Sequence, residues 1–147
     1  MQLVVAGSHS HTPNYVEHLM SIIRRKRLED RVHFAGHLSL AQLVALYSTC
    51  RALVLPSETE CCSQTLLEAL ACGSSMICSD LPENRDVAED AAIYVRIGDG
   101  DGLLKALIHI QDDSTMLEYR NRAARRRKEL PDWHEVAKRF TELSISS

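Results

Sequence analysis

Two glutamates, Glu60 and Glu68, combine a residue type and a spacing suited to a ligand with hydroxyl and phosphate groups. Both lie in residues 56–73, PSETECCSQTLLEALACG, which follow an apolar run and lead into a helix-like pattern. With seven residues between them, one carboxylate can face a ligand in the loop while the other lines the pocket wall. Carboxylates accept hydrogen bonds from a vicinal diol, and free N–H groups at a helix start bind phosphate. These groups together indicate a nucleotide-sugar site.

A plainer interpretation is that Glu60 is a solvated loop acid and Glu68 an exposed helix residue. Against it, the sequence neighbours of Glu68 are apolar: Leu66, Leu67, Ala69 and Leu70. A carboxylate in such surroundings is costly unless it is hydrogen bonded. The setting therefore favours a ligand-binding role for Glu68.

The elements that must position these acids follow an alternating pattern of short apolar runs and amphipathic stretches. Strands are expected over residues 2–6, 32–35, 52–55, 75–78 and 92–95. The pattern predicts an α/β fold: an open, mostly parallel, doubly wound (Rossmann-like) sheet of about five strands with helices on both faces. Ligands of such sheets bind outside the carboxyl ends of the strands, which is where residues 56–73 begin.

The helices are indicated by apolar residues at helical spacing and by their end signals. Two apolar stripes should pack on the sheet: Val16, Leu19, Met20 and Ile23, and Leu40, Leu43, Val44 and Tyr47. Ser39 is a suitable N-cap for the second stripe, and Gly73 can end the helix that carries Glu68 in a left-handed conformation. Further helices are expected after the loop at 98–102, over 114–129 and over 133–143.

The length and composition predict a single domain over residues 1–147. The start, MQLVVAGSHS, lacks a signal-peptide pattern and no apolar run would span a bilayer, so no transmembrane segment and a cytoplasmic location are expected. Seventeen basic and twenty acidic residues give a net charge of -3, which argues against a nucleic-acid partner. The basic runs at 24–27 and 125–128 are interpreted as solvated helix faces rather than polyanion sites.

The cysteines and histidines offer little support for metal or redox chemistry. The five cysteines are odd in number, lack zinc-type spacing and are expected to be reduced thiols. The adjacent pair Cys61 and Cys62 is assigned to packing or loop filling, because neighbouring residues rarely meet disulfide geometry. His9 and His11 could form a metal pair, but no third ligand is near them in sequence, so no metal is expected.

The pattern P-S-x-x-E, seven residues, then E-A-L-A-C-G resembles the signature of GT-B glycosyltransferases of the large group 1 family. Further segments resemble that family in the same order: LVVAG, LEDRVHFAGHLS, LVALYSTCRALVLPS, SMICSDLPENRDVAEDAAIYV and DWHEVAKRF. The resemblance covers nearly the whole chain and points to the C-terminal domain, which binds the nucleotide-sugar donor.

The resemblance implies a role for each matching residue. Glu68 would bind the donor ribose, and Glu60, as the catalytic residue, would contact the transferred sugar. The diphosphate would be held by the backbone around Ser63, Gln64 and Thr65, with Cys62 beside it. Gly36 and His37 would lie near the base, and Gly7 would complete the donor site. Members of the family retain the anomeric configuration and need no metal in the donor pocket, so no cofactor is implied.

Two departures from the family pattern affect what is expected. Cys62 and Ser63 stand where many members have Phe-Gly, so the loop should be less flexible and the sugar contacts different. The family's N-terminal acceptor domain, and a strand-helix unit with a basic pair for the diphosphate, have no counterpart in the sequence. The chain is therefore expected to act with a missing acceptor domain or subunit in transferring a hexosyl group to a glycan, lipid or other acceptor.

Two other interpretations of the sequence compete with that of a transferase. A non-catalytic α/β module that binds a nucleotide or a partner fits the missing acceptor half, and the coding region upstream of Met1 would discriminate it from a transferase. A phosphoacceptor receiver would need acids after the first strand, where residues 7–9 offer none.

The missing strand-helix unit also predicts a strand order. If the sheet closes the gap, the strand at 2–6 lies beside that at 52–55, in the order second, first, third, fourth, fifth, with Glu60 near the loop 8–12. The alternative is a homodimer in which a second chain fills the gap, with the apolar face of the helix at 133–143 encouraging association.

Overall fold

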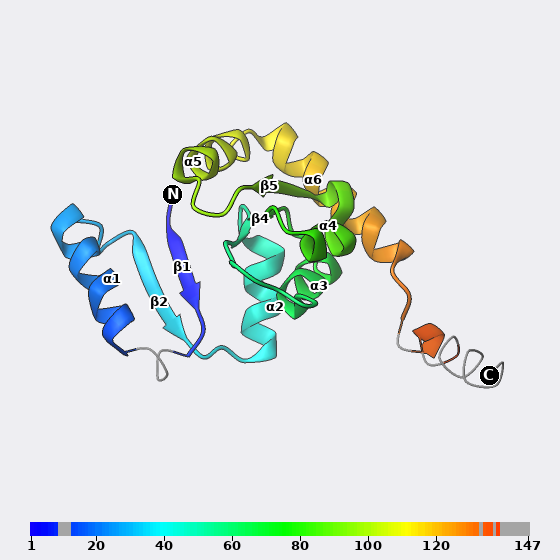
Figure 1. Cartoon of the computed structure of the whole chain (residues 1–147), viewed down its shortest axis with the longest axis horizontal. Helices are drawn as coiled ribbons and strands as arrows, with labels where there is room; N and C mark the ends of the chain where they lie inside the picture. Colours follow the sequence, from blue (N-terminus) through cyan, green and yellow to red (C-terminus); the bar gives the residue numbers. More distant parts are fainter. Residues whose placement is uncertain (9–12, 133, 137, 139–147) are drawn as a thin grey trace. The chain divides into compact units, whose positions relative to one another are not determined.

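The computed structural model describes residues 1–8, 13–132, 134–136 and 138, and the chain divides into two compact units, residues 1–43 and 44–147. All five expected strands are present, each within one residue of its expected ends. They are β1 (Leu3–Ala6), β2 (Val32–Gly36), β3 (Leu53–Leu55), β4 (Met76–Ser79) and β5 (Ala92–Val95) (Figure 1). Every strand pair among the described residues is parallel, which confirms the mixed α/β class.

The first unit is built around one parallel β-α-β crossover. Helix α1 (Pro13–Lys26) connects β1 to β2, and Leu3 pairs with Val32 at the start of the ladder. The expected apolar stripe of α1 is half-buried apart from Met20, which is exposed. The basic run at 24–27 is exposed, as expected, and most of it lies in the last turn of the helix, where cations interact favourably with the helix dipole.

The second unit holds the three-stranded sheet and the main core. Its strand order is β3-β4-β5, so β4 is central and all four of its residues are buried. Helix α3 (Gln64–Ala71) connects β3 to β4, and α4 (Pro82–Ala88) with the short 3₁₀ helix η1 (Glu89–Ala91) connects β4 to β5. Helices α5 (Gly100–His109) and α6 (Asp113–Glu129) follow. Figure 1 shows α5 on one side of β4 and β5 and α3 on the other.

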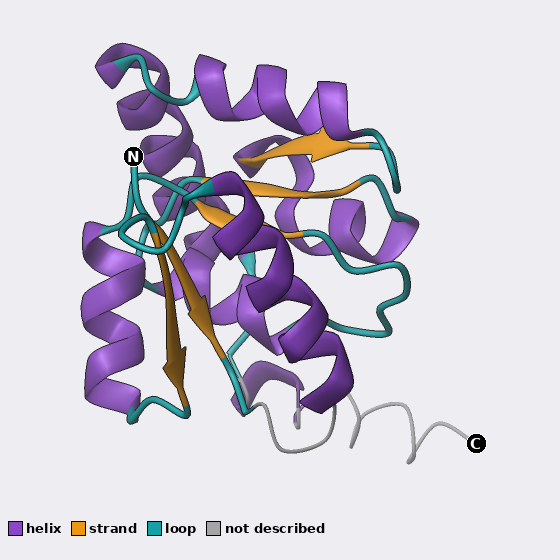
Figure 2. Ribbon diagram, turned by 90° about the vertical axis from the view of Figure 1, so that its left-hand side faces the viewer, coloured by secondary structure: helices purple, strands orange, loops and turns teal. Residues whose placement is uncertain are grey.

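Burial in this unit explains why the first three residues of β4, Met76 to Cys78, are apolar. On the α5 side, Ile77 packs with Ala106 and Ile110 in a core cluster. Leu66 and Leu70 of α3 are 0% and 1% exposed. Each fully buried aliphatic side chain of this kind contributes roughly 1.5–3 kcal/mol, so these contacts fix the position of α3. The turned view in Figure 2 shows the same helices around the sheet.

The expected order of strands in one five-stranded sheet is wrong. The structure has two sheets, β1-β2 in the first unit and β3-β4-β5 in the second, rather than one sheet of five strands. The prediction rested on the cost of leaving strand edges unpaired. That cost is small here, because β1 has four residues and β3 has three, and short edge strands are tolerated.

Helix α2 (Leu40–Thr49) begins as predicted and packs differently from the prediction. Ser39 and Gln42 form a reciprocal capping box, with the Ser39 N–H 2.9 Å from Gln42 Oε1. Along the expected apolar stripe, only Tyr47 is buried in this helix, whereas Leu40 and Val44 are 73% and 44% exposed. The helical period was therefore correct, and the expectation that the whole stripe packs on the sheet was wrong.

The end of α3 confirms the role expected of Gly73. This residue has φ 64°, the left-handed conformation that glycine adopts without strain. The N–H groups of Gly73 and Ser74 donate to the carbonyls of Leu70 and Ala69, at 3.1 and 2.9 Å. These two hydrogen bonds form a Schellman motif, which ends the helix and directs the chain toward β4.

Two parts of the helical structure fall outside the predictions. Helix α4 was not expected, although Pro82 at its start and Glu83 in its first turn are helix-start signals. Of the helix expected over 133–143, residues 134–136 and 138 are helical and the rest lie outside the described residues. Within the described part of the chain, no helix is long and apolar enough to cross a membrane.

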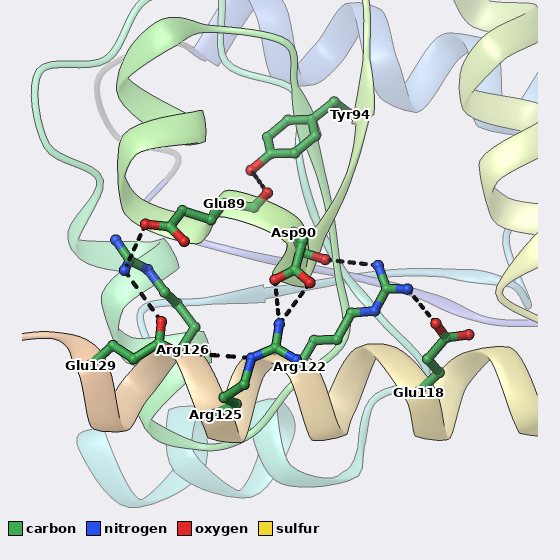
Figure 3. A network of polar contacts seen from close by, with 8 residues as sticks. All are labelled: Glu89, Asp90, Tyr94, Glu118, Arg122, Arg125, Arg126 and Glu129. Atoms are coloured by element: carbon green, nitrogen blue, oxygen red, sulfur yellow. Dashed lines mark hydrogen bonds and ion pairs between the residues drawn. The ribbon is translucent and has the colours of Figure 1, made fainter.

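The basic run at 125–128 is not wholly solvated, which corrects the expectation for one of its residues. The Arg126 side chain is 13% exposed and forms an ion pair with Glu89 at 2.8 Å. Its Nε also donates to the carbonyl of Val87 at 2.9 Å. Figure 3 shows this arginine and its neighbours reaching from α6 to η1 and pairing with acids of the same chain. The run therefore ties α6 to the segment before β5 rather than forming a polyanion site.

Candidate functional site

Helix α3 begins directly after the loop that follows β3, and its first N–H groups lie at that helix start. Ser63 is 4% exposed and caps the helix, with its Oγ accepting from the Leu66 N–H at 3.3 Å. The N–H groups of Gln64 and Thr65 have no acceptor among the described residues. Unpaired N–H groups and the positive end of the helix dipole attract a negatively charged ligand.

Glu68 lies one helical turn beyond Gln64, on the same face of α3. It is half-buried, and its Oε2 accepts a hydrogen bond from the Tyr47 hydroxyl at 2.9 Å. Desolvation and this bond raise the pKa of Tyr47 to about 12, so the phenol remains a donor. The Glu68 carboxylate, whose sequence neighbours are apolar, thus has a hydrogen-bond partner in Tyr47.

A set of main-chain contacts holds the Tyr47 end of α2. The Ser74 hydroxyl donates to the carbonyl of Tyr47, and Ser74 is 0% exposed. Arg120 of α6 donates to the carbonyls of Ser48 and Cys50 at 3.0 and 2.8 Å. Ser48 lies in the last turn of the helix, where intrahelical donors run out, and Cys50 directly follows the helix. The arginine and the serine therefore fix the segment from which the phenol projects.

The loop between β3 and α3 carries the other acid. Glu60 is half-buried, and its carboxylate forms no hydrogen bond or ion pair with residues in the described part of the chain. Cys61 and Cys62 beside it are exposed free thiols. The Glu60 carboxylate is therefore free to accept hydrogen bonds from a ligand.

In the first unit, the predicted glycines meet at the carboxyl ends of β1 and β2. The Gly7 N–H donates to the Gly36 carbonyl at 2.9 Å. Gly36 has φ 64°, a left-handed backbone that suits glycine at the turn out of β2. The next residue, His37, is exposed. Residues 9–12, which include His9, His11 and most of the loop expected near Glu60, lie outside the described residues.

A pocket that the sequence did not predict opens at the carboxyl ends of β3, β4 and β5. Its volume is about 250 Å³. Its lining includes Pro56, Ser79, Arg96, Gly98 and Asp99. Among the described residues that line this pocket, none is a predicted site residue. The glycine-rich loop at 98–102, which follows a parallel strand, is the sequence signal that could have indicated this pocket.

Neither metal nor disulfide chemistry is indicated by the side chains that the structure describes. All five cysteines are free. Over residues 1–8, 13–132, 134–136 and 138, no group of three or more His, Cys, Asp or Glu side chains could hold a metal ion.

Comparison with known protein families agrees with the parallel α/β fold described above. A family model described as glycosyl transferases group 1 matches residues 1–129. The chain belongs to this family. The sequence resemblance is therefore confirmed over most of the chain.

Individual relatives agree with this assignment. The O-antigen chain mannosyltransferase RfbU of Salmonella typhimurium is 32% identical over 98 residues, which are 67% of this chain and 28% of that protein. A glycogen synthase of Mycobacterium tuberculosis is 30% identical over 132 residues, 88% of this chain and 32% of that protein. This group 1 glycosyltransferase chain thus spans about a third of the length of these curated relatives.

Solved structures show the same fold. Sucrose-phosphate synthase from Thermosynechococcus elongatus matches 99% of this chain with 38% of its own, at a TM-score of 0.85 and 24% identity. Anabaena Alr3699/HepE, solved in complex with UDP-glucose, matches 99% of this chain with 41% of its own, at a TM-score of 0.86 and 19% identity. Both matches place the group 1 glycosyltransferase chain in the GT-B class of folds.

Within this glycosyltransferase chain, the structure groups the predicted site residues by unit. Residues 60–68 share the loop and helix after β3, and Gly7, Gly36 and His37 share the strand ends of the first unit. Tyr47, the partner of Glu68, was not among the predicted site residues, because its position in an apolar stripe suggested packing alone. The signal was available, since a buried phenol needs a hydrogen-bond partner.

Proposed function

We propose that the chain is the donor-binding domain of a glycosyltransferase and binds a nucleoside diphosphate sugar. The observation that carries the proposal is the arrangement on α3, where N–H groups without protein acceptors precede a half-buried, oriented carboxylate by one turn. N–H groups at a helix start suit the diphosphate, and a carboxylate accepts hydrogen bonds from the ribose diol. The likeness to a HepE structure that holds UDP-glucose supports this ligand class.

Each predicted residue has a role in this proposal. Glu68 binds the ribose, and Glu60, with a carboxylate free of internal contacts, faces the transferred hexose as the catalytic residue. The backbone of residues 63–65 holds the diphosphate, and Cys62 borders it. On the base side we place Gly7, Gly36 and His37, which lie at strand ends as ligand-contacting residues of parallel sheets do.

Transfer itself is proposed for a larger assembly. The matched part of this chain covers 28% of the mannosyltransferase RfbU and 32% of the glycogen synthase. We propose that an acceptor domain, in the same full-length protein or in a separate subunit, completes the cleft. The complete enzyme then retains the anomeric configuration of the hexosyl group as it passes to a glycan, lipid or other acceptor.

The ribose assignment is tested by calorimetry on the 147-residue chain with uridine, guanosine and adenosine diphosphates and their sugars. Glu68→Ala should weaken binding of the preferred ligand by about 1.5–3 kcal/mol, the range for hydrogen bonds to a charged group. Glu17→Ala is the matched control, because Glu17 is an exposed helix glutamate of α1. Equal affinities for wild type and Glu68→Ala would remove the assignment, and absence of binding by wild type would remove the function.

A further inference from the structure

We propose that Tyr47 is a positioning residue that orients the Glu68 carboxylate and thereby sets the preference for ribonucleotides over deoxyribonucleotides. The inference rests on the proposed function, since it concerns the same ribose contact. It adds a residue that does not itself touch the ligand and acts through the carboxylate it holds.

The geometry gives each oxygen of the Glu68 carboxylate a different role. The Tyr47 hydroxyl donates to Oε2 at 2.9 Å, which leaves Oε1 as the oxygen without this internal bond. The last torsion of a glutamate side chain is broad and nearly two-fold, so a free carboxylate samples many orientations. A fixed donor on one oxygen restricts that rotation and keeps the other oxygen in one direction.

Tyr47 is held firmly enough to act as such a donor. The residue is 8% exposed, and a tyrosine ring has only two side-chain torsions to order. Its own carbonyl accepts from the buried Ser74 hydroxyl. Arg120 fixes the following turn and also lies 3.5 Å from the Gly73 carbonyl, at the end of the helix that carries Glu68. One cation thus contacts the ends of both helices in the pair.

The protonation of Tyr47 agrees with a constant donor role. Burial, followed by the Glu68 hydrogen bond, raises the pKa of the phenol to about 12. The hydroxyl therefore stays protonated over the whole neutral range, and its hydrogen bond to the carboxylate does not switch with pH.

Orientation of the carboxylate has a consequence for ligand selection. A site built to hydrogen-bond a substrate hydroxyl rejects an analogue that lacks it, because the polar group of the site is left unpaired. This discrimination requires that the carboxylate cannot rotate and form a hydrogen bond to water in place of the missing hydroxyl. Loss of the Tyr47 hydroxyl should therefore reduce the ratio of deoxyribonucleotide to ribonucleotide dissociation constants, beyond any general weakening of both.

The test measures that ratio by calorimetry for wild type, Tyr47→Phe, Glu68→Gln and the double variant, using UDP and dUDP or the diphosphate pair of whichever base binds best. Tyr47→Phe should lower the ratio by about three- to tenfold, the loss expected for one intramolecular hydrogen bond of typical net strength. Glu68→Gln should lower it at least as much, and the double variant should fall no further, because both changes act through one carboxylate.

Tyr94→Phe is the matched control, since the Tyr94 hydroxyl donates to the Glu89 carbonyl at 2.6 Å, away from the carboxylate. It should leave the ratio at the wild-type value. If Tyr47→Phe does not fold, Ser74→Ala takes its place, because it keeps the phenol and removes the bond that holds Tyr47, and it should lower the ratio in the same direction.

The outcomes separate the inference from the proposed function. An unchanged ratio in Tyr47→Phe, or equal weakening of both ligands, would overturn the role of Tyr47 while leaving nucleotide binding by Glu68 intact. An unchanged ratio in Ser74→Ala, where that variant is needed, has the same meaning. A wild-type ratio in Glu68→Gln, or no binding by wild type, would overturn the proposed function and this inference with it.

Discussion

At the residue scale, the pair formed by Tyr47 and Glu68 shows how an acid is accommodated among apolar neighbours. The sequence indicated that Glu68 needed a partner, and the structure supplies it from a residue 21 positions earlier. Sequence spacing could not name that residue, because the contact depends on how α2 and α3 pack. The helix start at Ser63 was different, since its cap bonds to a residue three positions ahead and is encoded locally.

Asp112 at the start of α6 makes the stability of that helix depend on pH. Its carboxylate accepts from the Ser114 hydroxyl and from the Thr115 N–H, and these bonds lower its pKa from 3.8 to about 2. Because the folded pKa lies below the unfolded one, the ionised carboxylate stabilises the fold above pH 3.8. This contribution is lost as the pH falls through the folded value.

Thermal melts of wild type and Asp112→Asn from about pH 5 to about pH 2 check this expectation. Asparagine still caps the helix, so the comparison isolates the charge. The wild type should melt higher at the upper end of the range, and the difference should shrink as the pH approaches 2. A difference that stays constant over the range would contradict the assignment.

At the scale of elements, local signals predicted most of the fold. The five strands and the capping residues Ser39 and Gly73 follow from apolar runs and short-range hydrogen bonding, and the structure bears them out. The sheet order did not follow, because it depends on which strand edges are left open. Helix α4 was missed because its seven residues are too few for a clear apolar period.

Arg126 of α6 forms hydrogen bonds and an ion pair with the segment before β5. Arg126 donates to the carbonyls of Asp86 and Val87 at 2.8 and 2.9 Å, and pairs with Glu89, whose φ of 47° is unusual for a residue other than glycine. Arg126→Met keeps the stem of the side chain and removes these bonds. The free energy of unfolding should fall by about 2–3 kcal/mol, because charged hydrogen bonds are lost and partly buried groups are left unpaired.

Urea unfolding of Arg126→Met and of the neighbouring Arg127→Met provides the comparison. Arg127 is exposed, so its replacement should change the free energy of unfolding by no more than about 0.5 kcal/mol. Equal stabilities of the two variants would show that the contacts of Arg126 contribute little.

At the scale of the whole molecule, this chain matches only about a third of the length of its curated relatives, and this affects the activity that we expect of it. We expect the purified 147-residue chain to bind a nucleotide-sugar and to transfer no sugar. Transfer requires an acceptor held in line with the donor and a closed cleft that excludes water, and a donor-binding domain supplies only part of each.

A radiolabelled transfer assay with uridine, guanosine and adenosine diphosphate sugars, run with a range of simple glycan acceptors, checks this expectation. Binding measured in parallel by calorimetry is the control for a folded chain. Turnover by the purified chain alone would contradict the view that an acceptor domain is required.

The strand β1 has a practical consequence for work with the molecule. Leu3 and Val4 are 50% and 42% exposed, and among the described strands β1 is hydrogen bonded only to β2. An apolar strand with an open edge is a template on which further strands can pair, whether they belong to the same protein or to another copy. Although β1 is short, we therefore expect self-association through residues 3–6 to compete with folding as the chain concentration rises.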